Sequence, residues 1–409
     1  MTKEKVIPQI RFSGFTDTWE QRKLGEVADI VGGGTPSTSN DDYWDGDIDW
    51  YAPAEIADQI YVASSERKIT QQGYDNSSAK MLPVGTVLFT SRAGIGKTAI
   101  LRKEGCTNQG FQSIVPHINE LDSYFIFSRS EEMKRYGETV GAGSTFVEVS
   151  GKQMANMELM MPITMEEQVT IGSFFSNLDF LITLHQRKYD KLTKVKKAML
   201  EKMFPKNGSL YPEIRFKGFT DAWEQRKLGE VADIVGGGTP STSNDDYWDG
   251  DIDWYAPAEI ADQIYVASSE RKITQQGYDN SSAKMLPVGT VLFTSRAGIG
   301  KTAILRKEGC TNQGFQSIVP HINELDSYFI FSRSEEMKRY GETVGAGSTF
   351  VEVSGKQMAN MELMMPITME EQVTIGSFFS NLDFLITLHQ RKLEKLKNIK
   401  KACLEKMFV

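Results

Sequence analysis

One long segment occurs twice in this chain, and this repeat constrains the fold more than any other feature of the sequence. Residues 19–188 are identical to residues 223–392, with an offset of 204 residues between the copies. A solenoid repeat spans only roughly 20–50 residues, whereas this segment is long enough to bury a hydrophobic core of its own. The sequence therefore predicts two copies of one domain.

Each copy ends in a long amphipathic helix. Thr164 and Glu167 have the spacing of a capping box, which predicts the helix start, and Pro205 with Gly208 predicts its end. Apolar side chains recur in steps of three and four in both copies, as in a heptad seam. The predicted seam comprises Phe175, Leu178, Ile182, His185, Tyr189 and Leu192 in the first copy and Phe379, Leu382, Ile386, His389, Leu393 and Leu396 in the second.

These helices are long for the size of one domain. About 39 residues would make each helix roughly 58 Å long at 1.5 Å per residue. We therefore expect the two helices to pack antiparallel, as a spacer between two globular domains related by a pseudo-twofold axis. The alternative, in which each helix folds back on its own domain, stays open.

The globular copies mix strand-like runs, such as Val87 to Thr90, with loops rich in glycine, serine, asparagine and threonine. This mixture predicts an α/β or α+β fold class for each copy. The expected boundaries are a first domain at 1–165, a central helix at 166–204, a linker at 205–214, a second domain at 215–369 and a C-terminal helix at 370–409.

Bulk composition excludes several classes of protein. No window approaches the roughly 18 consecutive apolar residues of a membrane span, and the first residues lack the apolar centre of a signal peptide, so we expect a cytoplasmic protein. The three cysteines and four histidines have no metal-ligand spacing. A net charge of −8 argues against non-specific coating of nucleic acid, but it allows a local basic surface.

The segment SRAGIGKT, from Ser91 to Thr98 and again from Ser295 to Thr302, invites comparison with a phosphate-binding loop. A Walker loop needs a glycine at the position of Ser91, so a nucleotide site is not predicted. A strand that leads into an exposed, glycine-rich loop can still approach a DNA phosphate or a base edge closely. The alternative is a tight turn with solvated charges.

No catalytic pattern emerges from the remaining motifs. The acidic run from Asp41 to Asp49 lacks EF-hand ligands at Tyr43 and Ala52, so we interpret it as a solvated turn beside aromatic residues. There is no GxSxG elbow and no Asn-Pro-Pro-Tyr-like segment of an amino-methyltransferase. We expect no catalytic centre, no metal and no cofactor bound by this chain.

Five segments, in the same order in both halves, resemble the specificity subunits of type I restriction-modification systems. In the first copy they read GFTDTWEQRKLGEVADIVGGGTPSTSN, YWDGDIDWYAPAEI, VLFTSRAGIGKTAI, TNQGFQSIVP and GSTFVEVSGKQMANMELMMPITMEEQ. The resemblance implies two target-recognition domains that each read one half of a bipartite double-stranded DNA site. It also implies that two long antiparallel helices hold these domains apart.

The same resemblance implies the partners and their cofactors. Two modification subunits would dock on the helices and methylate adenine at N6 with S-adenosylmethionine. Restriction subunits would add translocation and cleavage that depend on ATP and Mg. The chain itself would be a non-catalytic subunit of the complex.

Polar and basic side chains of the loops are the candidate DNA contacts, because Asn and Gln pair with adenine, Arg pairs with guanine, and Ser, Thr and Lys hold phosphates. In the first copy they are Thr35, Arg67, Lys68, Gln71, Tyr74, Ser91, Arg92, Lys97, Asn108, Gln109, Gln112, Ser144 and Thr145. In the second copy they are Thr239, Arg271, Lys272, Gln275, Tyr278, Ser295, Arg296, Lys301, Asn312, Gln313, Gln316, Ser348 and Thr349. We expect fewer than half of them to touch bases. Base contacts should be more frequent in the stretch from Asp58 to Ser78 than in the segments that carry the family resemblance.

The exact repeat departs from the family pattern, in which the two recognition domains usually differ. Two identical domains related by a pseudo-twofold axis predict an inverted-repeat DNA target. The rival hypothesis is an acidic DNA mimic or anti-restriction protein that binds the same partners. It fits poorly, because 46 Lys and Arg nearly balance 54 Asp and Glu.

Overall fold

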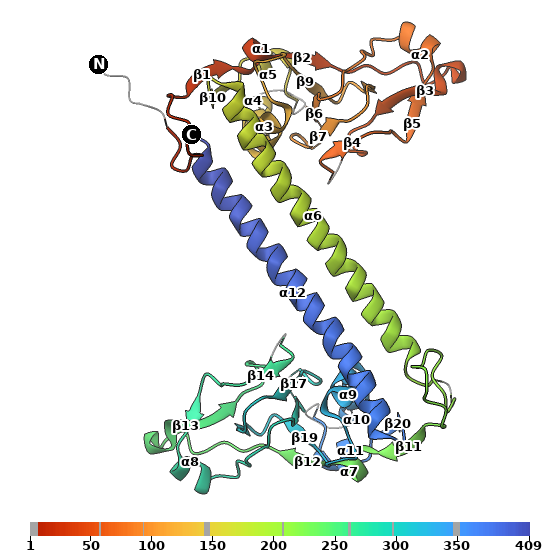
Figure 1. Ribbon diagram of the computed structural model, residues 1–409, viewed down its shortest axis with the longest axis vertical. Coiled ribbons are helices and arrows are strands. Elements are labelled where there is room, and N and C mark those ends of the chain that lie inside the picture. The colour runs from red at the N-terminus through yellow and green to blue at the C-terminus, as the bar shows by residue number, and fades with distance from the viewer. Residues whose placement is uncertain are drawn as a thin grey trace. The chain divides into compact units, whose positions relative to one another are not determined.

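The computed structural model describes residues 7–409 except 57–58, 93, 143–147, 207, 261–262, 297 and 347–351. Its contacts divide the chain into two compact units. Unit 1 consists of Met1–Gln186 with Arg391–Val409, and unit 2 consists of Arg187–Gln390 (Figure 1). Each unit therefore combines one globular copy with parts of both long helices.

The globular part of unit 1 alternates short strands and short helices. Its elements are β1 (Glu20–Lys23), α1 (Leu24–Val27), β2 (Ala28–Gly32), the 3-10 helix η1 (Asp41–Tyr43), β3 (Trp44–Tyr51), β4 (Tyr61–Val62), β5 (Arg67–Ile69), α2 (Gln71–Asp75), β6 (Val87–Phe89), β7 (Thr98–Leu101), β8 (Cys106–Thr107), β9 (Gln112–Pro116), α3 (Ser123–Ser128), α4 (Ser130–Gly141), α5 (Gly151–Ala155) and β10 (Glu158–Met161). The long helix α6 (Met165–Lys202) follows.

Unit 2 contains the same elements at equivalent positions. They are β11 (Glu224–Lys227), α7 (Leu228–Val231), β12 (Ala232–Gly236), η2 (Asp245–Tyr247), β13 (Trp248–Tyr255), β14 (Tyr265–Val266), β15 (Lys272–Ile273), α8 (Gln275–Asp279), β16 (Val291–Phe293), β17 (Thr302–Leu305), β18 (Cys310–Thr311), β19 (Gln316–Pro320), α9 (Ser327–Ser332), α10 (Ser334–Gly345), α11 (Gly355–Ala359) and β20 (Glu362–Met365). The second long helix, α12 (Met369–Met407), ends the chain.

Three small sheets form each copy. In unit 1 a five-stranded sheet has the order β2-β9-β6-β7-β4, a three-stranded sheet has the order β5-β3-β8, and β1 pairs with β10. The five-stranded sheet is antiparallel except where β4 runs parallel to β7. All three residues of β6 are buried, which fits its central position in the sheet.

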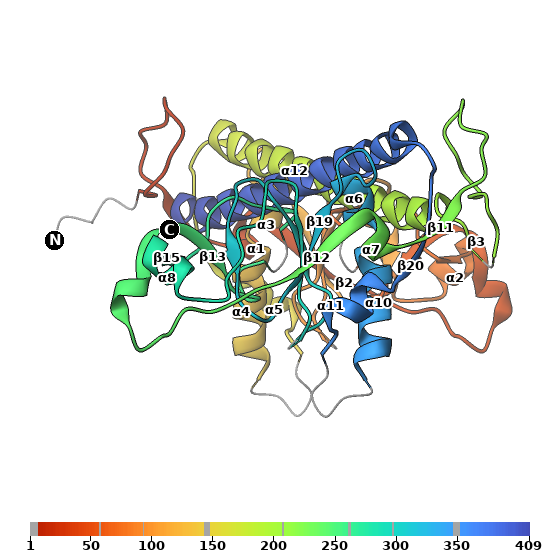
Figure 2. The same cartoon turned by 90° about the horizontal axis from the view of Figure 1, so that it is seen from below.

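Helices cover the five-stranded sheet and complete the main core. Asp122 caps the start of helix α3, because its carboxylate accepts hydrogen bonds from the backbone N–H groups of Tyr124 and Phe125. Helices α4 and α5 lie next to each other (Figure 2), and the Tyr136 hydroxyl donates to the Gln153 carbonyl over 2.8 Å. The predicted α/β fold class with two copies and two long helices is confirmed.

Each long helix begins in the core of its own unit. In unit 1, Ile171, Phe175 and Leu178 of α6 are buried against the sheet and α3. The last turns of α12 join the same core, where the Phe408 ring stacks on Phe175 with centroids 5.7 Å apart. Within unit 1, Asp179 of α6 also pairs with Lys400 of α12 over 2.6 Å.

These two contacts give the direction of the helices within unit 1. Residue numbers rise from Phe175 to Asp179 along α6 and fall from Phe408 to Lys400 along α12, so the two segments run antiparallel. Unit 2 repeats the arrangement with the helices exchanged, because Phe204 stacks on Phe379 and Lys196 pairs with Asp383 over 2.5 Å. The first turns of each helix thus pack in the core of the domain that precedes the helix, and within each unit the two helices contact each other.

The predicted seam residues divide among several environments. Phe175, Leu178, Phe379, Leu382 and Leu393 are buried. Leu192 and Leu396 pack on the cores of units 2 and 1, whereas the remaining seam positions Ile182, His185, Tyr189, Ile386 and His389 are half-buried. In the described part of the chain, no helix is both long enough and apolar enough to cross a membrane.

Candidate nucleic-acid interface

Three loops of the globular copy converge at one end of its five-stranded sheet, and we call them the loop cluster: residues 33–35, 91–97 (of which 93 is not described) and 107–112. The Gly34 amide donates to the Thr107 carbonyl over 2.8 Å, and the Ser91 amide donates to the Gly110 carbonyl over 2.8 Å. A Cβ atom at Gly33 would lie 2.0 Å from the Asn108 carbonyl oxygen, so only glycine allows this approach. The structure thus brings together segments that lie far apart in the sequence.

The described residues of the SRAGIGKT segment are held in a tight turn by hydrogen bonds to Thr90. The Thr90 hydroxyl donates to the Gly94 carbonyl over 2.7 Å and accepts from the Lys97 amide over 2.9 Å. Gly94 has φ 105° and Gly96 has φ 96°, conformations that favour glycine. Lys97 is exposed at the tip, so its ammonium group is free to meet solvent or a ligand.

The prediction that Ser91 and Ser295 contact DNA is wrong. Both residues are fully buried, and their hydroxyl oxygens have no hydrogen-bond partner among the described residues. A duplex cannot reach a hydroxyl below the protein surface. The neighbouring Arg92 side chain is 41% exposed and lies 4.0 Å from the Glu148 carboxylate, and Arg296 in unit 2 is 39% exposed at 3.9 Å from Glu352.

The other cluster residues have different accessibilities. The Thr35 hydroxyl donates to the exposed Gln109 side chain, and Thr239 does the same to Gln313. Asn108 and Asn312 are half-buried and fold their side-chain oxygens onto the amides of Gly110 and Gly314. Gln112 and Gln316 lie half-buried beside the first residues of α5 and α11, at Gly151 and Gly355, so their surroundings indicate a packing role.

The three-stranded sheet carries a second group of candidates around Trp44. The exposed Arg67 guanidinium stacks on the Trp44 ring at 3.6 Å, and Arg271 stacks on Trp248 at 3.7 Å. Such stacking fixes the plane of a guanidinium while its N–H groups stay available. Tyr74 is half-buried against this aromatic cluster, as is Tyr278 in unit 2, whereas Gln71 and Gln275 bond to Asp75 and Asp279 one helical turn later.

Lys68 is held by a buried carboxylate that the sequence did not reveal. Asp49 is 1% exposed and accepts hydrogen bonds from Lys68, from Lys103 at 2.6 Å and from Ser65. The prediction that the acidic run is a solvated turn is therefore wrong for Asp49. In unit 2, Asp253 holds Lys272 and Lys307 in the same way. Because the carboxylate neutralises part of their charge, these lysines are weaker DNA candidates than Arg67 and Arg271.

Both copies match the type I restriction modification DNA specificity domain, over residues 16–194 and 220–398. The chain belongs to this family. Curated relatives agree with the match. The MjaIX specificity subunit of Methanocaldococcus jannaschii is 32% identical over 228 residues, which cover 54% of this chain and 52% of that protein, so the aligned part is about half of each.

Two further comparisons extend over nearly the whole chain. The putative MjaX specificity subunit of the same archaeon is 24% identical over 98% of this chain and 95% of its own length. The solved S subunit of a type I restriction-modification system from M. genitalium has a TM-score of 0.64 at 13% identity and covers 99% of each chain, which supports the fold. Both halves of this chain are therefore type I restriction modification DNA specificity domains, and the relatives that it matches are named specificity subunits.

Four of the candidate DNA contacts belong to segments that the structure does not describe. Ser144, Thr145, Ser348 and Thr349 lie outside the described residues. Among the residues that are described, no group of His, Cys, Asp and Glu is arranged to hold a metal ion. The candidates that remain exposed or half-exposed in the loop cluster and on the three-stranded sheet carry basic, amide or hydroxyl groups.

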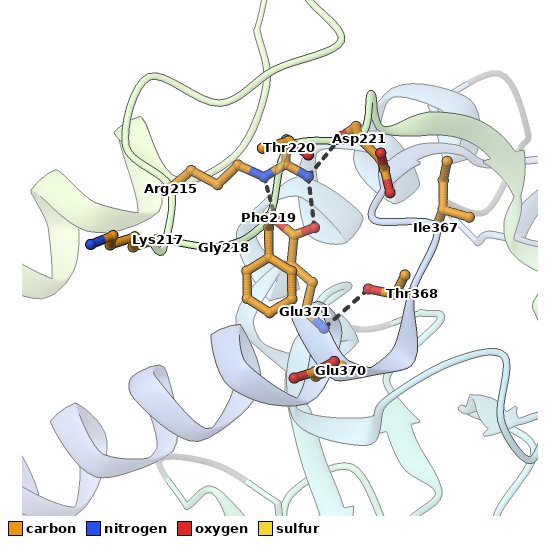
Figure 3. Close-up of a pocket in the computed structure, with 10 residues that line it drawn as sticks. All are labelled: Arg215, Lys217, Gly218, Phe219, Thr220, Asp221, Ile367, Thr368, Glu370 and Glu371. Atoms are coloured by element: carbon orange, nitrogen blue, oxygen red, sulfur yellow. Dashed lines mark hydrogen bonds and ion pairs between the residues drawn. The ribbon is translucent and has the colours of Figure 1, made fainter.

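A hollow of about 300 Å³ lies beside the first turn of α12 in the specificity subunit (Figure 3). Arg215 crosses it and binds both carboxylate oxygens of the buried Glu371 over 2.7 and 2.8 Å. The Trp223 indole N–H donates to the same carboxylate over 3.2 Å, and Arg215 also reaches the Asp221 carbonyl. Because these polar groups satisfy one another, we assign the hollow a structural role in fixing the helix start.

The Asp49 cluster makes the stability of the specificity subunit sensitive to acid. Burial alone would raise the pKa of Asp49, but hydrogen bonds from Lys103, Lys68 and Ser65 outweigh it and hold this pKa well below its usual range. An aspartate in the unfolded chain has a pKa of about 3.9. The stabilisation is therefore fully present above that pH and is lost as the pH falls toward the folded pKa.

We expect Asp49→Asn with Asp253→Asn to lower the free energy of unfolding at pH 7 by about 1–3 kcal/mol per unit. The same double variant should lose less stability than the wild type between pH 5 and pH 3, because the titrating carboxylates are absent. Urea unfolding at several pH values measures both effects. An unchanged pH dependence would show that these carboxylates titrate alike in the folded and unfolded chain.

Proposed function

We propose that this specificity subunit reads a bipartite, inverted-repeat DNA target and docks two adenine-N6 modification subunits. The observation that carries the proposal is the equivalence of the two units. In unit 1, Asp179 of α6 pairs with Lys400 of α12, and in unit 2, Asp383 of α12 pairs with Lys196 of α6. The same ion pair therefore occurs in both units, with α6 and α12 in exchanged positions. The target-recognition domains would be residues 1–165 and 215–369, with spacer helices at 166–204 and 370–409 and a linker at 205–214.

The equivalence supports an inverted target rather than a direct repeat. Each recognition domain precedes the start of one long helix, and the helical segments within each unit run antiparallel. Two identical domains related by a pseudo-twofold axis would bind the two half-sites of one duplex in opposite orientations. Because residues 19–188 and 223–392 are identical, both would read the same bases, and the half-sites would form an inverted repeat.

The reading surface that we propose consists of the exposed and half-exposed candidates of each copy. Arg92, Lys97, Thr35 and Gln109 project from the loop cluster, and Arg67 lies on the three-stranded sheet. Arginine and glutamine suit bidentate pairing with guanine and adenine, whereas lysine and threonine suit phosphate contacts. The partner subunits would supply S-adenosylmethionine, ATP and Mg, and the complex would act on DNA in the cytoplasm.

Methylome sequencing of a host that carries this chain and its modification subunits tests the target. We expect N6-methyladenine in one motif whose two halves are inverted copies, separated by a spacer of fixed length. Two unrelated half-sites would contradict the twofold arrangement. Absence of any sequence motif, in the presence of methylation, would contradict specific recognition itself.

Arg92 and Arg296 provide a direct test of the loop cluster. Arg92→Ala with Arg296→Ala should weaken binding of the complex to its target by about 1–3 kcal/mol per half-site, if each guanidinium contacts a base. Binding to a scrambled duplex should change much less. Lys23→Ala with Lys227→Ala is the control, because it removes the same charge from exposed positions on the β1–β10 and β11–β20 sheets. Equal losses for both variants in a gel-shift titration would assign the effect to net charge.

A further inference from the structure

Charge is distributed unevenly along both long helices. Residues 168–186 contain a single charged side chain, that of Asp179, whereas residues 187–202 contain seven Lys or Arg and two Asp or Glu. Residues 391–406 of α12 likewise contain seven basic and two acidic residues. Each of these two 16-residue segments carries a formal charge of +5 in a chain whose net charge is −8.

The basic residues of α6 occupy the face that points away from the core of unit 2. Leu192, Val195 and Met199 pack on that core, and Lys196 is paired with Asp383. On the opposite side, basic residues recur at helical spacing and are exposed. This exposed face, the α6 basic face, comprises Arg187, Lys191, Lys194 and Lys197.

Helix α12 has the equivalent feature in unit 1. Leu396, Cys403 and Leu404 pack on the core of unit 1, and Lys400 is paired with Asp179. The exposed basic residues outside this contact form the α12 basic face, which comprises Arg391, Lys395, Lys397 and Lys401.

The basic segments lie in one of the few regions where the two copies differ. Lys194 of the first copy is replaced by Asn398 in the second, but Thr193 is replaced by Lys397. The number of basic residues in the segment is therefore the same in both copies, although the position of one lysine differs.

We propose that the α6 and α12 basic faces each bind DNA phosphates outside the bases read by the loop clusters. This inference rests on the proposed function, which supplies double-stranded DNA as the ligand. Flexible lysine ammonium groups on an exposed helix face attract phosphates and carry no sequence information. The two faces would give an acidic chain the local positive charge that DNA binding needs.

A protein partner is the competing occupant. A groove of about 540 Å³ runs beside Arg187, Lys191 and Lys194, and its apolar part is formed by Val195, Ala198 and Met199. An acidic amphipathic helix of another subunit would fit such a groove. Lysine is depleted in the buried parts of protein interfaces, however, and is a common phosphate ligand, so the composition of both faces favours DNA.

The test uses the full chain in complex with its modification subunits. Three lysines of each face become glutamine, which keeps helix propensity while removing charge. The variant carries Lys191→Gln, Lys194→Gln, Lys197→Gln, Lys395→Gln, Lys397→Gln and Lys401→Gln. Binding to a target duplex and to a scrambled duplex is measured at several NaCl concentrations, and circular dichroism checks that the helices and the melting temperature are unchanged.

We expect the slope of log K against log salt to fall by about 0.9 for each phosphate that the variant no longer neutralises. Binding to the two duplexes should weaken by the same factor, so their affinity ratio stays constant. A control variant in which Lys23, Lys152, Lys227 and Lys356, all exposed, become glutamine should leave the slope nearly unchanged. An equal fall of the slope in the control would overturn the proposal.

Two other outcomes also overturn it. An unchanged salt slope in the six-lysine variant shows that the faces do not contact phosphates. If that variant also loses its modification subunits during purification, the faces bind protein instead. Failure of the proposed function looks different, because the wild-type complex would then show no preference for the target over the scrambled duplex.

Discussion

Phe204→Ala is expected to lower the free energy of unfolding of unit 2 by about 3–5 kcal/mol, the usual cost of removing a buried aromatic ring. Phe204 lies just beyond the end of α6, in the core of the second globular copy. Its ring stacks on Phe379 with centroids 6.0 Å apart and meets Trp223 and Phe329 at 6.0 and 5.8 Å. Alanine would leave a cavity among aromatic side chains that cannot close without moving the sheet and α9.

Phe408→Ala is the matched variant in unit 1, where the Phe408 ring contacts Phe175, Phe125 and Trp19. Calorimetry of each variant should show about half of the unfolding enthalpy at a lower temperature. Limited proteolysis with a tag at one terminus then identifies the unit that opens first. A single transition that shifts as a whole would contradict separate cores, and unchanged unfolding would contradict the packing of the rings.

The repeat and the long helices could be predicted from sequence because both leave a periodic signal. An offset of 204 residues and a heptad pattern are visible without any knowledge of packing. The packing of Phe204 and Phe408 into the two cores leaves no periodic signal in the sequence. The sequence at the end of a helix is similar whether that end is exposed to solvent or packed in a core. Tertiary contacts between residues more than 150 positions apart decide it.

The sequence predicted which segments form the candidate DNA interface better than it predicted which individual residues are accessible there. The sequence indicated the three segments that the structure brings together at the loop cluster, whereas the DNA contacts of these segments and of Arg67 stay predictions. It failed for Ser91, because a polar residue beside glycines is typical of an exposed loop, whereas the backbone turns this side chain inward. It also failed for Asp49, which is buried because Lys68 and Lys103, far away in sequence, compensate its charge.

A chain of residues 1–204 alone is expected to form a homodimer. Such a fragment lacks Arg391–Val409, so the surface of Trp19, Phe125 and Phe175 that Phe408 covers would be exposed to water. The end of α6 in a second fragment offers the same side chains. Residues 196–204 differ from residues 400–408 only in having Met199 where the other copy has Cys403.

Each fragment would thereby complete the core of its partner, which is the isologous contact of a twofold dimer. Sedimentation of the fragment should give the mass of two chains, and its melting temperature should rise with concentration because folding and association are coupled. Phe204→Ala in the fragment should shift the equilibrium toward monomer, whereas Lys152→Ala on α5 should not. A folded monomer at micromolar concentration would mean that the globular copy needs no second helix end. In that case the aromatic contacts of Phe204 would contribute far less than the roughly 3–5 kcal/mol expected from its burial.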